Sequence, residues 1–319
     1  MKRIRPVWLC VVLAACAAPA TPVPPTPTAA PPSPTAPHAA TALSTEPPAP
    51  TPSATPTPSV LRFAVIGDFG QGGQAEADVA ALVHSWSPDI VITVGDNNYP
   101  SGSADTIDAH IGAYYYDFIY PYSGAYGPGA TENRFFPTLG NHDWYTEGAE
   151  PYFAYFTLPA NERYYDFTSG PVHFFAVDSD GSEPDGVGRS SAQADWLRQA
   201  MAASDSPWNV VYFHHPPYSS GLHGSITWMR WPFAEWGADA VLAGHDHTYE
   251  RLLVDGIPHF VNGLGGGAIY YFVNTLPESQ FRYNGGHGAM LVTATEAEMV
   301  FSFFGIEGEL IDTYEVRTP

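Results

Sequence analysis

Five short apolar segments in this sequence share one feature, which is that each ends at a residue able to bind a metal ion. The segments are residues 61–66, 90–94, 135–139, 209–213 and 240–243. Short apolar runs bounded by glycine and polar residues are typical of buried strands. The candidate ligands that follow them are Asp68, Asp96, Asn141, His214 and the pair His245 and His247. We therefore expect five strands with polar groups at their carboxyl ends.

Segments with helical spacing of apolar residues lie between several of these strands, at residues 75–84, 192–201 and 226–236. Strands that alternate with helices predict an α/β sheet. From residue 251 onward the pattern changes to strands without helices, such as residues 287–295 and 298–304. We expect these later strands to form a second sheet.

The carboxyl ends of the strands are where binding sites form in open α/β sheets, so the candidate ligands should converge on one crevice. A single buried Asp or His is more often a satisfied core or capping group, but five strand ends with the same property are not explained in that way. Carboxylate, amide oxygen and imidazole suit hard or borderline metal ions. Thiolate ligands are excluded, because the only two cysteines, Cys10 and Cys16, precede all the strands.

The motifs around these ligands resemble the five sequence blocks of the calcineurin-like metallophosphoesterases. In order, they are Asp68-x-Gly70, Gly95-Asp96-x-x-Tyr99, Gly140-Asn141-His142-Asp143, His214-x-Pro216 and Gly244-His245-x-His247. Their order and spacing match across residues 66–251, and residues 244–251 (GHDHTYER) are especially similar to purple acid phosphatases. The resemblance implies a four-layer αββα sandwich of the α/β (α+β) class, with two central mixed sheets flanked by helices.

Position 70 distinguishes subfamilies within that superfamily. Many members have a metal-binding histidine there, whereas this chain has Gly70. Tyr99 stands three residues after Asp96, where purple acid phosphatases, including the tartrate-resistant type, have a metal-binding tyrosinate. A phenolate favours a hard trivalent ion, so the resemblance implies Fe(III) in the first site. The alternative is that Tyr99 is a packing aromatic in a chain with 19 tyrosines.

The resemblance also implies a ligand set for two metal ions. The first ion would be held by Asp68, Tyr99, His247 and a bridging Asp96. The second, a divalent ion that could be Fe, Zn or Mn, would be held by Asn141, His214, His245 and the same Asp96. His214 is preferred over His215 because the family pattern is His-x-Pro.

Two further histidines match catalytic positions of the family. His142 follows the Asn141 ligand and resembles the histidine that contacts the substrate phosphate or the leaving group. His223 lies nine residues after His214, where the mammalian-type enzymes have a second such histidine. The alternative for His223 is an exposed loop residue without a catalytic role.

These features predict a phosphatase with two metal ions that hydrolyses small phosphomonoesters by attack of metal-bound hydroxide, as an acid phosphatase does. One alternative is a phosphodiesterase or nucleotide hydrolase with the same metal centre, and another is a surface binding protein without turnover. A formal net charge of -21 repels nucleic-acid backbones, so we expect no nucleic-acid partner. The sequence does not indicate an oligomeric state.

The first 59 residues differ from the rest in composition. Residues 1–15 have a basic start followed by an apolar run too short to span a bilayer, which predicts a signal peptide. The sequence Leu13-Ala14-Ala15-Cys16 resembles a bacterial lipobox, which implies a lipidated Cys16 and an extracytoplasmic, cell-surface or secreted protein. An ordinary signal peptide with a different cleavage site is the alternative. Residues 16–59, rich in Pro, Thr and Ala, predict a disordered stalk before a catalytic domain at 60–319.

Overall fold

The computed structural model describes residues 60–318. Three of the predictions lie outside these residues: the signal peptide at 1–15, the lipidation of Cys16 and the stalk at 16–59. Among the described residues, no helix is both long enough and apolar enough to cross a membrane.

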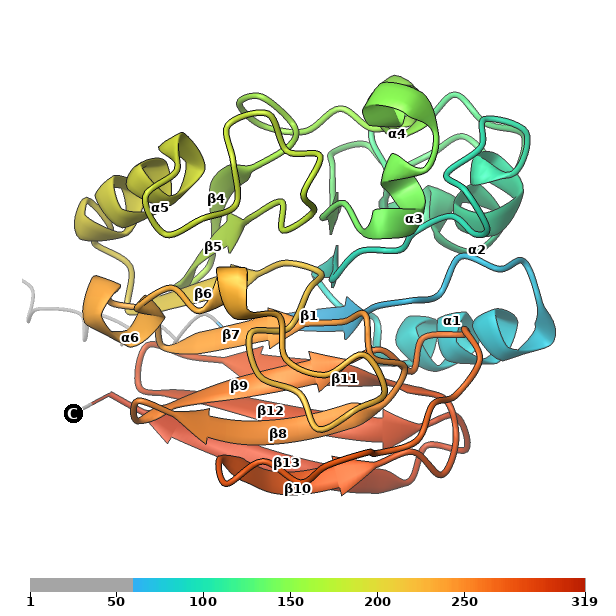
Figure 1. The fold of residues 1–319 in the computed structure, drawn as a ribbon. Coiled ribbons are helices and arrows are strands. Elements are labelled where there is room, and N and C mark those ends of the chain that lie inside the picture. The colour runs from blue at the N-terminus through green and yellow to red at the C-terminus, as the bar shows by residue number, and fades with distance from the viewer. Residues whose placement is uncertain (1–59, 319) are drawn as a thin grey trace, which may run out of the picture. The chain divides into compact units, whose positions relative to one another are not determined.

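One of the two sheets has six strands in the order β13-β12-β11-β1-β2-β3 (Figure 1). Its first strand, β1, lies inside the sheet, where it pairs in parallel with β2 and antiparallel with β11. The sheet therefore combines the beginning and the end of the described chain. Its strands are β1 (Leu61–Ile66), β2 (Ile90–Thr93), β3 (Phe135–Pro137), β11 (Gly288–Ala294), β12 (Glu298–Gly305) and β13 (Leu310–Arg317).

The other sheet has seven strands in the order β10-β8-β9-β7-β6-β5-β4. Strands β5, β6, β7 and β9 run parallel, and antiparallel strands close both edges of the sheet. The bounds are β4 (Tyr165–Ser169), β5 (Val172–Ala176), β6 (Trp208–Tyr212), β7 (Ala240–Ala243), β8 (Tyr249–Val254), β9 (Ile257–Asn262) and β10 (Ser279–Tyr283). Both sheets are thus mixed.

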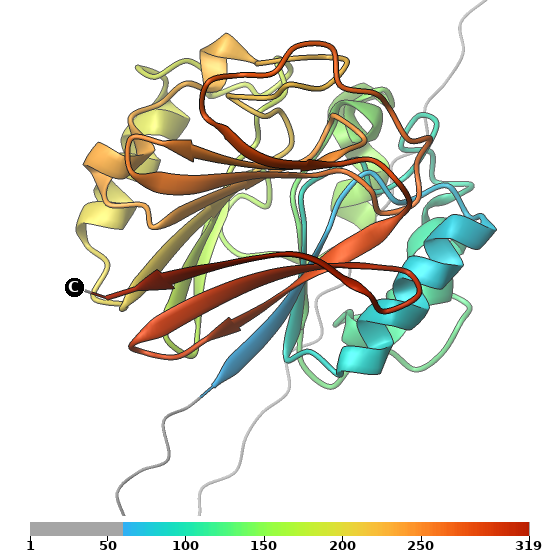
Figure 2. The ribbon, with the colours of Figure 1, turned by 90° about the horizontal axis from the view of Figure 1, so that it is seen from below.

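Helices cover the outer side of each sheet (Figure 2). α1 lies beside the six-stranded sheet, and α5 and α6 lie beside the seven-stranded sheet. The α-helices are α1 (Gln74–Trp86), α2 (Ala113–Tyr115), α3 (Asn141–Trp144), α4 (Glu150–Tyr155), α5 (Ala192–Ala202) and α6 (Phe233–Trp236). A π-helical turn spans Asp108–Gly112, and 3-10 turns span Tyr116–Phe118, Glu147–Ala149 and Thr227–Met229.

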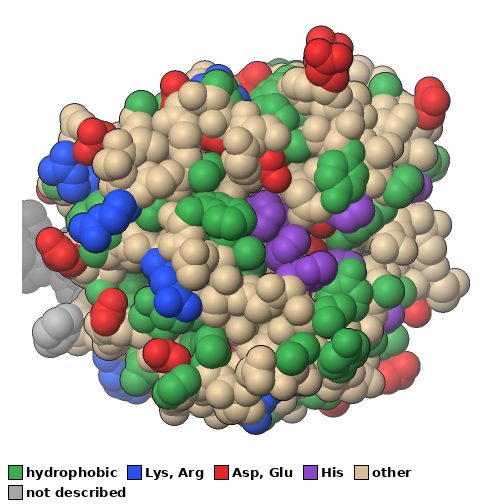
Figure 3. Space-filling view, in the orientation of Figure 1, with side chains coloured by type: hydrophobic (Ala, Val, Ile, Leu, Met, Phe, Trp, Pro, Cys, Tyr) green, Lys and Arg blue, Asp and Glu red, His purple; other side chains and the backbone are tan. Residues whose placement is uncertain are grey.

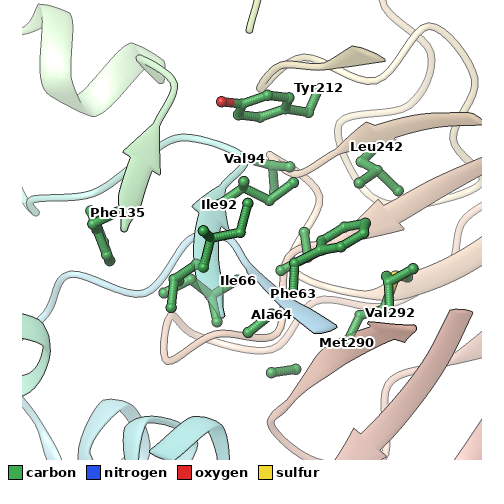
Figure 4. Packing of buried hydrophobic residues seen from close by; sticks show 14 of the residues in the cluster. Phe63, Ala64, Ile66, Ile92, Val94, Phe135, Tyr212, Leu242, Met290 and Val292 are labelled. Carbon is green, nitrogen blue, oxygen red and sulfur yellow. The ribbon is translucent and has the colours of Figure 1, made fainter. Parts of the chain in front are cut away.

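Side chains along β6 and just after it point alternately to the two faces of the sheet, and so they contact both neighbouring layers. Val210 and Tyr212 point into the core between the sheets, whereas Val211 and Phe213 belong to the separate apolar cluster under α5 and α6. Figure 4 shows the inter-sheet core, where Tyr212 and Leu242 from one sheet approach Phe63 and its neighbours from the other. Two sheets packed face to face and covered by helices confirm the predicted four-layer αββα sandwich.

Two expectations about the elements are wrong. The strands after residue 251 do not form a sheet of their own, because β8, β9 and β10 extend one sheet and β11, β12 and β13 extend the other. The expected helix at 226–236 is two short helical segments, since Arg230 and Pro232 between them have non-helical ψ angles of 66° and 63°. The antiparallel pair β4 and β5 was not expected at all.

Candidate metal centre

The predicted ligands lie in the turns that directly follow the strands. Asp68, Asp96 and His245 each come after a glycine and have left-handed backbone conformations, with φ of 57°, 54° and 68°. Non-glycine residues adopt this region rarely, at a cost of about 1–3 kcal/mol each, and they cluster at functional sites. Hydrogen bonds hold these turns together, since the Asp68 amide donates to the Gly95 carbonyl at 3.1 Å.

One group of ligand atoms surrounds the Tyr99 hydroxyl. This oxygen lies 3.0 Å from Asp96 Oδ2, 3.0 Å from His247 Nε2 and 3.4 Å from Asp68 Oδ1. His247 Nε2 and Asp68 Oδ1 are themselves 3.4 Å apart. The structure therefore brings together all four residues predicted for the first metal ion.

A second group of ligand atoms surrounds His214 Nε2. This nitrogen lies 3.1 Å from Asn141 Oδ1, 3.1 Å from His245 Nδ1 and 3.4 Å from Asp96 Oδ2. The four residues predicted for the second metal ion are therefore also together. Asp96 Oδ2 belongs to both groups, which is the position that a bridging carboxylate requires.

The donor set fits metal ions better than it fits hydrogen bonding alone. His214 Nε2 carries either one proton or one lone pair, so it cannot satisfy three polar neighbours at 3.1–3.4 Å. The single Tyr99 proton likewise faces three acceptors. A cation in each group would interact favourably with all the oxygen and nitrogen lone pairs at once.

Backbone carbonyls orient two of the imidazole ligands. The Nδ1–H of His214 donates to the Val94 carbonyl at 2.9 Å, and the Nδ1–H of His247 donates to the Ala268 carbonyl at 2.6 Å. These contacts leave Nε2 of both rings facing the ligand groups. Fixing the tautomer and orientation of a metal-binding histidine through its other nitrogen is common in metal sites.

Close approach of the chain at Gly140 completes the second group. A Cβ atom at this position would lie 2.2 Å from Asp96 Oδ1 and 2.3 Å from the Asp96 amide nitrogen. Only glycine therefore lets Asn141 come next to the bridging carboxylate. Asp143 holds the same turn, since its carboxylate accepts from the Gly140 amide at 2.8 Å and from the Asn97 side chain at 2.9 Å.

Burial shapes the protonation of the site. Burial and the charges of Asp96 and Asp68 raise the pKa of Tyr99 well above its ordinary value of 10.0. Tyr99 therefore stays a phenol unless a cation stabilises the phenolate. Burial lowers the pKa of His245 below its ordinary value and lowers that of His215 to about 3. Both rings are neutral near pH 7, so they retain a lone pair that can bind a metal.

His214 and Asp96 form a charged pair. Burial alone would raise the pKa of Asp96, but His214 and His142 hold it well below its ordinary value. Burial would lower the pKa of His214, yet the charge of Asp96 raises it to about 10. A metal ion that binds His214 Nε2 must replace this proton, so metal binding should release protons to solvent.

The two predicted catalytic histidines lie at the edge of this site. His142 Nε2 is 4.0 Å from Asp96 Oδ2, and its Nδ1–H donates to the Pro100 carbonyl at 2.6 Å. The ring of the exposed His223 is 4.5 Å from the ring of His245. The buried His215 is also close, with its ring 4.5 Å from that of His245 and Nδ1 3.0 Å from Ser179 Oγ.

Sequence reasoning missed several residues that shape the site. Tyr270 stacks on His247 with ring centroids 4.1 Å apart and an interplanar angle of 4°. The Asp246 carboxylate accepts from the His223 amide at 2.8 Å and from the Ser219 hydroxyl at 2.5 Å, which holds the loop that carries His223. Asp246 lies inside the GHDHTYER motif, so its position could have suggested a supporting role, but Tyr270 lies in a loop without a motif.

A family model described as calcineurin-like phosphoesterase matches residues 61–249, which is more than half of the chain. Purple acid phosphatase 15 from Arabidopsis thaliana is 27% identical over 230 residues, which cover 63% of this chain and 42% of the relative. Tartrate-resistant acid phosphatase type 5 from Mus musculus is 24% identical over 254 residues, which cover 67% of this chain and 75% of the relative. The chain thus spans less than half of the plant relative.

A solved structure of the purple acid phosphatase PPD1 from yellow lupin (Lupinus luteus) seeds has the same fold. Its TM-score is 0.66 at 19% sequence identity, and the match covers 82% of this chain and 54% of that chain. The family match spans β1 to the start of β8, and so it includes every strand that leads into a predicted ligand. The chain therefore belongs to the calcineurin-like phosphoesterase family.

Proposed function

We propose that the chain is a phosphoric monoester hydrolase of the purple acid phosphatase type, with two metal ions in its active site. The observation that carries the proposal is the position of Asp96 Oδ2, which is 3.0 Å from the Tyr99 hydroxyl and 3.4 Å from His214 Nε2. One carboxylate can then bind two cations, and a phenolate at Tyr99 would favour a hard trivalent ion. The acid phosphatase names of the two relatives support the same activity.

In this proposal Asp68, Tyr99 and His247 hold Fe(III), and Asn141, His214 and His245 hold Fe, Zn or Mn in the divalent state. Two bound ions would polarise the phosphoryl group and lower the pKa of a coordinated water. His142 keeps Nε2 directed at the site, because its Nδ1–H donates a hydrogen bond to the Pro100 carbonyl. It can therefore bind a phosphate oxygen or donate a proton to the leaving oxygen. His223, on the side of His245, is the second candidate for this role.

Paired substrates test the proposal. The metal-loaded protein should hydrolyse p-nitrophenyl phosphate faster than bis(p-nitrophenyl) phosphate, and chelation of the metals should stop both reactions. Faster hydrolysis of the diester would favour a phosphodiesterase. A protein that holds two metal ions per chain and hydrolyses neither ester would instead be a binding protein with the fold of the enzyme.

We also propose that the protein is extracytoplasmic and anchored through a lipid on Cys16, because Leu13-Ala14-Ala15-Cys16 resembles a lipobox. Cell fractionation tests this. Wild type should fractionate with membranes and Cys16→Ser should be released, with the same turnover of p-nitrophenyl phosphate. A wild-type protein already free of membranes would contradict the anchor.

A further inference from the structure

Three loops each bring an aromatic ring beside a histidine of the candidate metal centre. The ring of Tyr145 lies 4.7 Å from that of His142, and the ring of Trp228 lies 6.2 Å from that of His215. Tyr270, stacked on His247, is also 5.3 Å from His223. The three aromatics follow β3, β6 and β9, so they approach the centre from separate parts of the chain.

Tyr145 and Trp228 expose their rings, unlike most aromatics of the domain. Their exposed fractions are 62% and 45%, and Tyr271 and Leu222 at the same loops are 61% and 39% exposed. Figure 3 shows hydrophobic side chains on more than one side of the clustered histidines. Core packing therefore does not account for these two side chains, whose exposed area is available to a bound molecule.

Hydrogen bonds hold both exposed rings in place. The indole N–H of Trp228 donates to the Ser179 carbonyl at 3.2 Å, and the Ser179 hydroxyl in turn contacts His215. The Tyr145 hydroxyl accepts from the Asn141 side-chain amide at 3.1 Å. Rings fixed in this way lose little conformational freedom when a ligand stacks on them, which favours binding.

In the part of the chain that the structure describes, no basic side chain joins the histidine cluster. In Figure 3 the arginines lie apart from the histidine cluster, and the only lysine of the chain is Lys2. The two arginines that flank the ligand loops have other partners, since Arg230 lies over the Tyr218 ring and Arg251 pairs with Asp312. Among the described residues, a second phosphate group or a long acidic substrate would therefore find no arginine beside the histidine cluster.

We propose that Trp228 and Tyr145 form a subsite for a planar aromatic leaving group, so that the preferred substrates are aryl esters carrying a single phosphate. This inference rests on the proposed phosphatase function. With the phosphate at the two ligand groups, the organic part of the ester must pass the histidines that these two rings adjoin. Stacking on an aromatic ring favours an apolar organic group, and among the described residues no arginine joins the histidine cluster, which favours a single phosphate.

Binding of phosphonates tests the subsite without a chemical step. In calorimetric titrations of the metal-loaded protein, phenylphosphonate should bind more tightly than methylphosphonate. Trp228→Ala should lower the affinity for phenylphosphonate about three- to tenfold, as expected for loss of one aromatic contact. The same substitution should leave the affinities for methylphosphonate and inorganic phosphate unchanged. Trp228→Phe should restore most of the loss. Tyr145→Leu should also weaken binding of phenylphosphonate, whereas Tyr126→Ala, at another exposed tyrosine, should leave the affinities unchanged.

Equal affinity of wild type for the two phosphonates would overturn the subsite. An equal fall in the affinities for both phosphonates in Trp228→Ala would overturn it as well. Tighter binding of pyrophosphate than of phenylphosphonate would also overturn it, because pyrophosphate has no ring and its second phosphate would need a site of its own. A metal-loaded wild type that binds none of these ligands, inorganic phosphate included, would overturn the phosphatase proposal itself.

Discussion

The phenol oxygen of Tyr99 lies 3.0 Å from Oδ2 of Asp96, so a residue assigned to one metal ion contacts the residue assigned to both. This contact places the two most informative substitutions of the site side by side. Substitution of Tyr99 tests the identity of one metal ion, and substitution of Asp96 tests whether two ions are bound.

Tyr99→Phe keeps the ring and its packing but removes the oxygen. Because a phenolate bound to Fe(III) absorbs visible light, iron-loaded wild type should be coloured and the variant should lose the visible band. Absorption spectra of the two proteins make the comparison. Tyr145→Phe is a matched control, since its hydroxyl touches Asn141 but is not a predicted ligand, and it should keep the band. Colourless iron-loaded wild type would remove Tyr99 from the ligand set.

Asp96→Ala should abolish binding of both metal ions, since its carboxylate belongs to both ligand groups. Elemental analysis of the purified protein should find about two metal ions per chain in wild type and nearly none in the variant. Asp195→Ala, at an exposed helical position, should retain the wild-type content. A variant of Asp96 that kept two ions per chain would show that this residue is not the bridge.

Arg251 joins the two sheets. Its Nε and Nη2 donate to the Asp312 carboxylate at 2.7 and 3.0 Å, which links β8 of one sheet to β13 of the other. Arg251→Met leaves this largely buried carboxylate without its cation, so we expect the free energy of unfolding to fall by about 2–3 kcal/mol. Urea denaturation measures the change. Arg198→Ala breaks an exposed pair with Asp195 and should cost less than about 1 kcal/mol. Equal losses of unfolding free energy in the two variants would contradict a stabilising role for the Arg251–Asp312 pair between the sheets.

Glu76 makes stability depend on pH. It is fully buried in the first turn of α1, and burial raises its pKa from 4.5 to about 9, although the Gln71 and Gly72 amides donate to it. Between these pH values the unfolded chain releases a proton that the folded chain keeps, so stability falls as pH rises. Glu76→Gln mimics the protonated acid and should remove this dependence.

The measurement compares unfolding of wild type and Glu76→Gln near pH 5 and pH 8. The variant should gain stability relative to wild type at the higher pH, on the order of a few kcal/mol, and little at the lower pH. Glu132→Gln, at an exposed loop position, should show no such difference. A gain of the same size at both pH values would mean that Glu76 is ionised in the folded protein.

The candidate metal ligands could be predicted from the sequence more completely than the assignment of strands to sheets. Asp68, Asp96 and Asn141 each follow a strand and a glycine, and this local pattern is enough to predict their convergence. Which sheet a strand joins depends on partners far along the chain, as when β11 pairs with β1, so the C-terminal strands were assigned wrongly. Tyr270 reaches His247 through a loop of glycines and aromatics, and no local pattern indicates where such a loop folds.

The pairing of β1 has a consequence for the order in which the protein matures. β1 ends two residues before Asp68, and one of its two neighbours is β11, whose pairing extends from Met290 to Ala294. During synthesis the edge of β1 that pairs with β11 stays unpaired until almost the whole chain has been made. Insertion of metal should therefore follow completion of the polypeptide, and a nascent or C-terminally truncated chain should be a poor acceptor of metal ions.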